Sequence, residues 1–160
     1  MAVAESWNVT FGNITETNVQ QLRKLNSAIF PVRYHDKFYA DILSTNPDFT
    51  QFVYSNDLIV GAMCCRIEDS EFPNHKKLYI MTLGVLASWR RRGIGSKLLR
   101  RAITNLLHYP NIREIYLHVQ TSNQEAAHGF CVEAKIENYY NRIEPPDCYL
   151  LQRCVEDNVP

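Results

Sequence analysis

Apolar residues recur along the chain with two different periods, and each change of period marks an element. Between residues 19 and 29 they follow the 3.6-residue period of a helix, with Thr15 or Thr17 as its cap and Pro31 as its end. The same period returns over residues 38–43 and 96–107. The pattern therefore predicts three helices, of which the last is strongly amphipathic.

Strand-like segments make up most of the remaining chain. They are rich in β-branched and aromatic side chains and are bounded by turn sequences such as Ser55-Asn56-Asp57. The predicted strands cover residues 7–11, 51–54, 58–67, 78–83, 113–119, 132–142 and 148–155. We see no repeat, low-complexity tract or long linker that would divide them. The order of elements thus predicts a single mixed α/β or α+β domain over residues 1–160, with a core at about 7–155.

The composition narrows the class of function. With 160 residues and 46% hydrophobic content, the chain suits one domain with a substantial core. Its 17 basic and 17 acidic residues give a formal net charge of zero. This balance argues against nucleic-acid or membrane binding as the main function, because both usually need a basic excess. No apolar run reaches a membrane-spanning length, so we expect no membrane partner.

The cysteines indicate a reducing compartment. They are odd in number and lack C-x-x-C spacing, which favours free thiols over disulfides or a metal site. The adjacent pair should point to opposite faces of a strand. The five are Cys64, Cys65, Cys131, Cys148 and Cys154. Because no N-terminal stretch resembles a signal peptide, we expect a protein of the cytosol or nucleus with no bound metal.

The most informative segment is the turn before the third helix, Arg90-Arg91-Arg92-Gly93-Ile94-Gly95. Glycines let the backbone approach a ligand closely, and a helix start presents N–H groups with partial positive charge. The arginines add positive charge for the same oxyanions. The segment fits neither a dinucleotide fingerprint, which needs Gly or Ala where Leu98 stands, nor a P-loop. It predicts a phosphate-cradling turn, with an ordinary glycine turn before a basic helix face as the alternative.

Four further segments accompany this turn. They are IFPVRY at 29–34, LYIMTLGVL at 78–86, IYLHVQ at 115–120 and NYYNRIEP at 138–145. The turn resembles the R/Q-x-x-G-x-G/A pyrophosphate motif of the Gcn5-related N-acetyltransferases, and the segments together resemble the San-type N-terminal acetyltransferases, the catalytic subunits of NatE. The similarity runs from about residue 9 to residue 154. It implies the acetyltransferase fold, a mixed sheet that splays beside the cofactor.

The resemblance also implies an activity, the transfer of acetyl from acetyl-coenzyme A to the α-amine of nascent peptides that begin with Met and an apolar residue. Such a reaction needs a base, because a protonated ammonium has no lone pair. The resemblance gives this role to Tyr79 and His118, acting through an ordered water. Imidazole titrates near neutral pH and a phenol does not, so His118 is the better base and Tyr79 the orienting group.

The resemblance assigns two binding surfaces. The cofactor would lie along one strand and over the turn, held by Leu83, Gly84, Val85, Arg90, Arg91, Arg92, Gly93, Ile94, Gly95, Ser96 and Asn123. Apolar and aromatic side chains would clamp the peptide, namely Phe30, Pro31, Val32, Tyr34, Met81, Tyr139, Tyr140 and Ile143. For Phe30, packing in the core is an equally good interpretation; for the tandem tyrosines it is a poor one.

One segment departs from the family pattern. After Asn123 the family carries a crossover helix with a Phe-Tyr pair, whereas residues 124–130 here read QEAAHGF, which is too short for that helix. The alternatives are a splice form, an imperfect gene model and a catalytically weak docking subunit of the NatA complex, the ribosome-bound partner that the resemblance implies. Lysine or small-amine acetylation is a compatible side activity, and nucleic-acid binding by the arginines is disfavoured.

Overall fold

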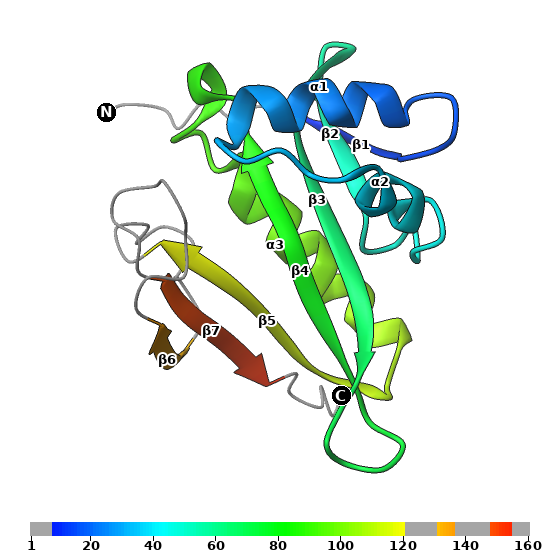
Figure 1. Cartoon of the computed structure of the whole chain (residues 1–160), viewed down its shortest axis with the longest axis vertical. Coiled ribbons are helices and arrows are strands. Elements are labelled where there is room, and N and C mark those ends of the chain that lie inside the picture. Colours follow the sequence, from blue (N-terminus) through cyan, green and yellow to red (C-terminus); the bar gives the residue numbers. More distant parts are fainter. Residues whose placement is uncertain (1–7, 121–130, 137–147, 155–160) are drawn as a thin grey trace.

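The computed structural model describes residues 8–120, 131–136 and 148–154, with side chains described from 8 to 118. Within these segments α1 (Val19–Ile29) and α2 (Asp36–Ile42) pack on one face of a sheet and α3 (Ile94–Asn105) on the other (Figure 1). The strands are β1 (Thr10–Asn13), β2 (Gln51–Ser55), β3 (Leu58–Asp69), β4 (Lys76–Val85), β5 (Ile112–Gln120), β6 (Cys131–Ile136) and β7 (Cys148–Cys154). The predicted site residues outside the described ones are Asn123, Tyr139, Tyr140 and Ile143.

The sheet is mixed, because one pair of neighbouring strands runs parallel. Its order is β1-β2-β3-β4-β5-β7-β6, in which β4 and β5 are parallel and the other neighbours are antiparallel. α3 lies in the crossover that such a parallel pair requires. The parallel pairing stops at Ile80 and Leu117, after which β4 and β5 diverge (Figure 1). This confirms the splayed mixed sheet expected from the sequence.

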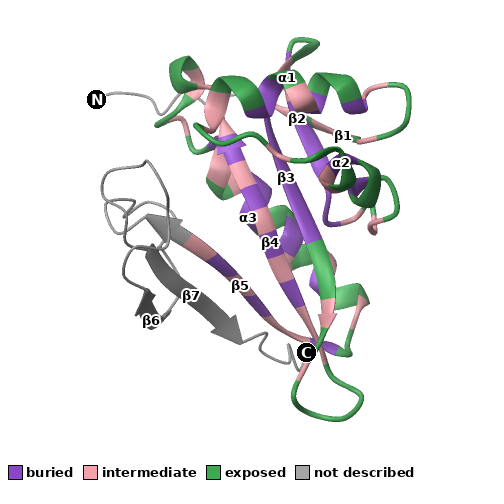
Figure 2. Ribbon diagram, viewed as in Figure 1, coloured by how far each residue is buried: buried purple, intermediate pink, exposed green. Residues whose placement is uncertain are grey.

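Two hydrophobic clusters fill the two sides of the sheet. Every second residue of β4 from Leu78 onward is buried (Figure 2), and Leu78 and Ile80 pack in the cluster that contains α3. The buried residues of α3 form one stripe of an amphipathic helix, Ile94, Leu98, Leu99 and Ala102. Met81 belongs to the opposite cluster, with α1 and α2. Beyond Met81 the order reverses, since Leu83 and Val85 pack against the cluster with α3.

The adjacent cysteines lie on opposite faces of β3, which confirms the expectation from strand period. Cys64 packs in the cluster with α1 and α2, and Cys65 in the cluster with α3. Both are free and buried. Burial raises the pKa of Cys64 to about 12. At neutral pH its side chain is therefore a thiol that packs as a small apolar group, not a reactive thiolate.

The start of α1 differs from the expected threonine cap. The N-cap residue is Asn18, whose side-chain oxygen accepts a hydrogen bond from the backbone N–H of Thr15 at 2.7 Å. The hydroxyls of Thr15 and Thr17 bond each other, 2.8 Å apart, and cap no helical N–H. The threonines are thus used by the turn that leads into the helix. The predicted end is confirmed, since α1 stops at Ile29, two residues before Pro31.

Strand boundaries differ from expectation where pairing with a neighbour decides them. β1 begins at Thr10, later than predicted, because its pairing with β2 begins there. β3 continues to Asp69 and β4 starts at Lys76, each two residues beyond the predicted strand, because Glu68 pairs with Lys77 and Asp69 with Lys76. Asn56 and Asp57 have φ angles of 48° and 67°, which confirms the tight turn between β2 and β3.

The short connection between β5 and β6 is long enough to join them. Gln152 of β7 pairs with both Tyr116 and Cys131, so β6 begins level with Tyr116, four residues before the end of β5. The connection must therefore run back about 13 Å along the strand direction and cross two strand spacings of about 4.8 Å each. Residues 121–130 can span up to about 33 Å. A crossover helix of family length is therefore not needed to connect these strands.

Candidate active site

The two predicted catalytic side chains meet where β4 and β5 begin to separate. Tyr79 is half-buried on β4, one residue before the last paired position, and His118 follows the paired segment of β5. The Tyr79 hydroxyl lies 3.1 Å from His118 Nδ1, and the two rings are perpendicular, with centroids 5.6 Å apart. The resemblance assigned the two residues to one role, and the structure brings their side chains within hydrogen-bond distance.

The surroundings of His118 favour a neutral imidazole. Partial burial lowers the pKa of His118 below its ordinary value of 6.5, because a charged ring loses hydration there. In one tautomer the Tyr79 hydroxyl donates to Nδ1, and in the other Nδ1–H donates to the phenol oxygen. When Nδ1–H donates, the lone pair of the neutral ring is on Nε2; when the hydroxyl donates, the lone pair is on Nδ1, which can take up the phenol proton as the phenol oxygen gains another. A proton acceptor is thus present at the site without any conformational change.

We expect NMR titration of the folded protein to give a midpoint below pH 6.5 for His118, with the His118→Gln chain identifying its signal. The folded-state pKa is lower than the unfolded one, so the unfolded chain binds more protons as the pH falls below 6.5. This histidine therefore makes folding less favourable as the solution is acidified. A midpoint above 6.5 would mean that a nearby acceptor stabilises the imidazolium, and the site would then lack a free base at neutral pH.

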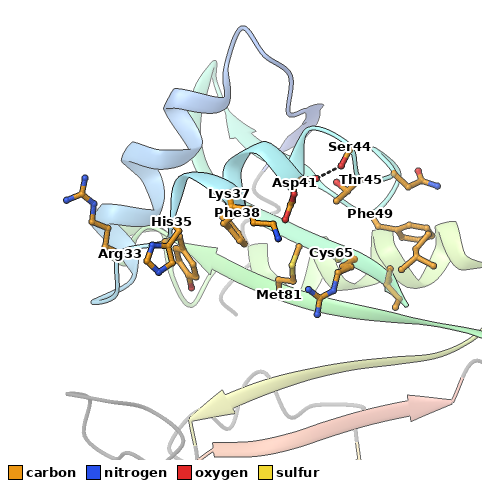
Figure 3. A pocket seen from close by; sticks show the side chains of 15 residues that line it. Arg33, His35, Lys37, Phe38, Asp41, Ser44, Thr45, Phe49, Cys65 and Met81 are labelled. Carbon is orange, nitrogen blue, oxygen red and sulfur yellow. Dashed lines mark hydrogen bonds between the residues drawn. The ribbon is translucent and has the colours of Figure 1, made fainter. Parts of the chain in front are cut away.

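A cavity of about 700 Å³ opens between α2, the loop before it, and strands β3 and β4 (Figure 3); its lining includes Leu78 and Met81 of the Tyr79 strand but neither Tyr79 nor His118. Its apolar lining includes Phe38, Leu78 and Met81, and charged side chains such as Arg33 and Arg66 also line it. Tyr34 and Met81, both predicted to hold the peptide, line it. Sequence reasoning missed Phe38 and Arg66, although the aromatic side chain of Phe38 lies on a helix with a buried face.

The other described residues of the predicted peptide clamp lie between α1 and α2. Phe30 contacts Tyr34 edge-on at 6.0 Å between centroids, and Tyr34 stacks on Phe38 at 4.6 Å. Val32 is 42% exposed, and Pro31 is also exposed. The Phe30 ring is half-buried against Gly84, where an added Cβ would come within 2.8 Å of its Cζ atom. Core packing thus accounts for part of the role of Phe30 and explains why residue 84 is a glycine.

The predicted cofactor strand has an edge that no described strand pairs beyond Ile80. β4 pairs with β3 through Val85, but its pairing with β5 ends at Ile80 in the described strands. Backbone groups of residues 81–85 on the β5 side are therefore free of β5, and an extended ligand can pair with them as an added strand would. The Val85 carbonyl accepts a hydrogen bond from Arg90 Nε at 3.0 Å. Arg90 thus folds back onto the end of β4 and does not reach over the turn.

The arginine–glycine turn has the backbone shape that an anion site requires. Arg91 and Gly93 have φ angles of 63° and 75°, and Gly93 is the N-cap of α3, with no side-chain cap. The N–H of Lys97 donates to the Gly93 carbonyl at 3.0 Å. The N–H groups of the preceding residues, Ile94, Gly95 and Ser96, therefore belong to the open first turn of the helix. Nothing lies within 4 Å of a Cβ built on either glycine, so the space in front of these groups is open.

The three arginines of the turn have different surroundings. Arg90 bonds the end of β4, as described above. The Arg92 guanidinium lies over the Trp89 ring, 4.7 Å from its centroid. Arg91 is exposed beside the helix start. The open helix start and its adjacent cations fit a phosphate or pyrophosphate group. In the described residues no group of three His, Cys, Asp or Glu side chains could hold a metal ion, and no described helix is long and apolar enough to cross a membrane.

Comparison with known proteins shows the family to which this chain belongs. Residues 19–133 match the model of the acetyltransferase (GNAT) family. The chain is 45% identical to N-alpha-acetyltransferase 50 of Danio rerio over 91% of its length and 88% of that protein, and 40% identical to the probable N-acetyltransferase san of Drosophila melanogaster over 96% and 84%. Naa50 of Arabidopsis thaliana, solved in complex with the bisubstrate analogue CoA-Ac-MVNAL, shares 45% identity with a TM-score of 0.80, over 91% of this chain and 97% of that one. The chain therefore belongs to the acetyltransferase (GNAT) family and, within it, to the group of N-alpha-acetyltransferase 50 and san proteins.

Proposed function

We propose that this chain is an N-terminal peptide acetyltransferase that uses acetyl-coenzyme A. The observation that carries the proposal is the contact between the Tyr79 hydroxyl and His118 Nδ1, 3.1 Å apart, at the point where β4 and β5 separate. The open helix start of α3 and the aromatic-lined cavity by α2 complete the site. Support comes from the Arabidopsis relative, whose bound analogue joins coenzyme A, an acetyl group and a peptide in one molecule.

The cofactor would be held mainly by backbone groups. The first-turn N–H groups of α3, including that of Gly95, and the exposed Arg91 suit the pyrophosphate. The free edge of β4 suits the amides of the pantetheine arm. Asn123 is a further predicted contact outside the described residues. Acetyl-coenzyme A, when bound, supplies an acetyl carbon activated by its thioester.

His118 is the proposed proton acceptor for the peptide amine. Its lowered pKa keeps the imidazole neutral at pH 7, so it can accept a proton from an ammonium directly or through a water. With the Tyr79 hydroxyl donating to Nδ1, a proton taken by the phenol oxygen can pass on to the imidazole. The deprotonated amine then has the lone pair that forms the new nitrogen–carbon bond. Tyr79 holds the acceptor in place and gives up its proton only as it gains another, so no free phenolate is needed at neutral pH.

The proposed peptide substrate begins with Met and an apolar residue. Tyr34, Phe38 and Met81 give the cavity an apolar and polarizable lining that suits a Met side chain. The analogue in the Arabidopsis relative carries the sequence MVNAL, in which Met is followed by an apolar valine. Tyr139, Tyr140 and Ile143 remain predicted contacts outside the described residues. Lysine acetylation is proposed only as a side activity of the same base.

Thermal unfolding separates an enzyme from a docking subunit without activity. At a concentration of 100 Kd, acetyl-coenzyme A should stabilise a competent enzyme by about 2.7 kcal/mol, which raises Tm by roughly 5–10 °C in a domain of this size. Transfer to a Met-Leu peptide should accompany this shift, and a peptide with a blocked N-terminus should not react. A chain with neither shift nor transfer would be a docking subunit, which the short segment after Asn123 would then explain.

The proposed partner and location follow from the resemblance and the free thiols. We place the chain in the cytosol or nucleus, where Cys64 and Cys65 would stay reduced. The NatA complex on the ribosome is the proposed partner, since nascent chains present their N-termini there. Co-purification of the tagged chain with NatA subunits and ribosomes tests this proposal. Recovery of the chain without them under gentle conditions would contradict it.

A further inference from the structure

A row of side chains crosses three strands beside the proposed base. Arg66 on β3 is the register partner of Tyr79 on β4, which is in turn the partner of Tyr116 on β5. The rings of Tyr79 and Tyr116 stack at 4.6 Å with an interplanar angle of 16°. The Arg66 guanidinium lies 5.4 Å from the centroid of the Tyr79 ring. The ring that bonds His118 is therefore flanked by a second ring on one side and a cation on the other.

One carboxylate connects the two flanking groups. Glu68 Oε2 accepts hydrogen bonds from Arg66 Nε at 2.9 Å and from an Arg66 terminal nitrogen at 2.6 Å. Its other oxygen, Oε1, accepts a hydrogen bond from the Tyr116 hydroxyl. The Glu68 side chain is only 20% exposed, although it lies near the end of a hairpin strand. Both oxygens are thus used in charge-assisted hydrogen bonds, which hold their partners more firmly than neutral ones do.

We propose that Glu68 is a positioning residue for acetyl transfer. By holding Arg66 and Tyr116, it fixes the ring of Tyr79 between them and so fixes the hydrogen bond from Tyr79 to His118. The inference rests on the proposed function, in which this hydrogen bond orients the proton acceptor. Glu68 contacts neither Tyr79 nor His118 in the described hydrogen bonds, so its effect passes through its two partners.

A purely structural ion pair accounts poorly for this arrangement. A lone ion pair between residues two apart on one strand, with the Arg66 side chain 55% exposed, contributes little to stability. The same hairpin contains such a pair, Asp69 with Lys76, in which the Asp69 side chain is 86% exposed. No hydrogen bond or ion pair described for Asp69 reaches a ring of the row. Asp69→Asn is therefore a matched control, since it removes the same charge one residue away from Glu68.

Kinetics of the whole chain provide the first test. Glu68→Gln keeps the shape of the side chain but weakens its hydrogen bonds with Arg66, because a neutral amide replaces the carboxylate. We expect kcat for a Met-Leu peptide to fall on the order of tenfold, because a loosely held acceptor loses alignment. KM for the peptide and for acetyl-coenzyme A should stay within about twofold. Tyr116→Phe keeps the stacked ring and loses one hydrogen bond, so its kcat should fall less. Asp69→Asn should behave as the unmodified chain.

NMR gives a readout that does not depend on catalysis. With labelled histidine and tyrosine, the His118 and Tyr79 signals should shift in Glu68→Gln and in Tyr116→Phe, and should stay in place in Asp69→Asn. Unchanged signals and an unchanged kcat would overturn the proposal, and so would a loss confined to the KM of the peptide. If the unmodified chain transfers no acetyl group, the proposed function fails separately. The NMR comparison then still decides whether Glu68 positions Tyr79 and His118.

Discussion

Replacing Gly95 with valine is expected to abolish measurable binding of coenzyme A while the domain stays folded. Gly95 is the second residue of α3, and nothing lies within 4 Å of a Cβ built on it, so the protein itself has room for a side chain. That room is where phosphate oxygens would approach the N–H groups of the helix start. A valine there should weaken binding by at least about a hundredfold, or roughly 2.7 kcal/mol.

Calorimetric titration with coenzyme A measures this loss, and thermal unfolding monitors the fold. Gly95→Ala is the graded control, because its single methyl group should weaken binding less while a better helix former supports α3. Gly93 is a poorer choice, since its φ angle of 75° strains any other residue whether or not a ligand binds. Full affinity in the Gly95→Val chain would show that no phosphate lies against this turn.

Replacing His118 with alanine is expected to lower kcat on the order of a hundredfold, as the loss of a general base does. The side chain acts on the proton of the amine and not on the peptide side chains, so KM should change little. Steady-state acetylation of a Met-Leu peptide, with both substrates varied, separates the two parameters. His118 is the histidine to replace, because its Nδ1 atom lies 3.1 Å from the Tyr79 hydroxyl oxygen.

Two further variants sharpen the result. Tyr79→Phe keeps the ring that stacks on Tyr116 but removes the hydroxyl, so it tests orientation of the imidazole apart from packing. His108→Ala removes an exposed histidine from the short 3-10 helix that follows α3 and should leave kcat and KM unchanged. A fall that lies wholly in KM would make His118 a peptide-binding residue, and the base would have to be sought elsewhere.

Local chemistry was enough to predict much of the fold and part of the site. The apolar period predicted the stripe of α3, and the Asn56-Asp57 turn was predicted because those residues tolerate positive φ. The two-residue alternation of side chains along a strand puts Tyr79 on the same face of β4 as Met81, and His118 on the same face of β5 as Tyr116. The glycine turn before α3 was predicted for a similar reason, since a helix start after a glycine turn is a short-range feature, whereas phosphate binding there stays a prediction.

Long-range pairing decided what the sequence could not. The threonines near residue 15 are good caps by type, yet the turn before α1 uses them and leaves Asn18 as the N-cap. Pairing between β3 and β4 converted an apparent polar connection into strand, and so carried Glu68 into the row beside the proposed base. A carboxylate in a polar stretch carries no signal of such a role, because its partners come from strands that are distant in the sequence.

The sequence by itself determined which residues can do chemistry, because residue type, strand period and turn propensity are local properties. The tertiary structure alone decided which of them meet. Tyr79 and His118 are 39 positions apart, and only the parallel register of β4 with β5 places the phenol against the imidazole. The point at which those strands separate is likewise a property of their pairing, which ends at Ile80 and Leu117, and beyond it no described strand pairs with this edge of β4.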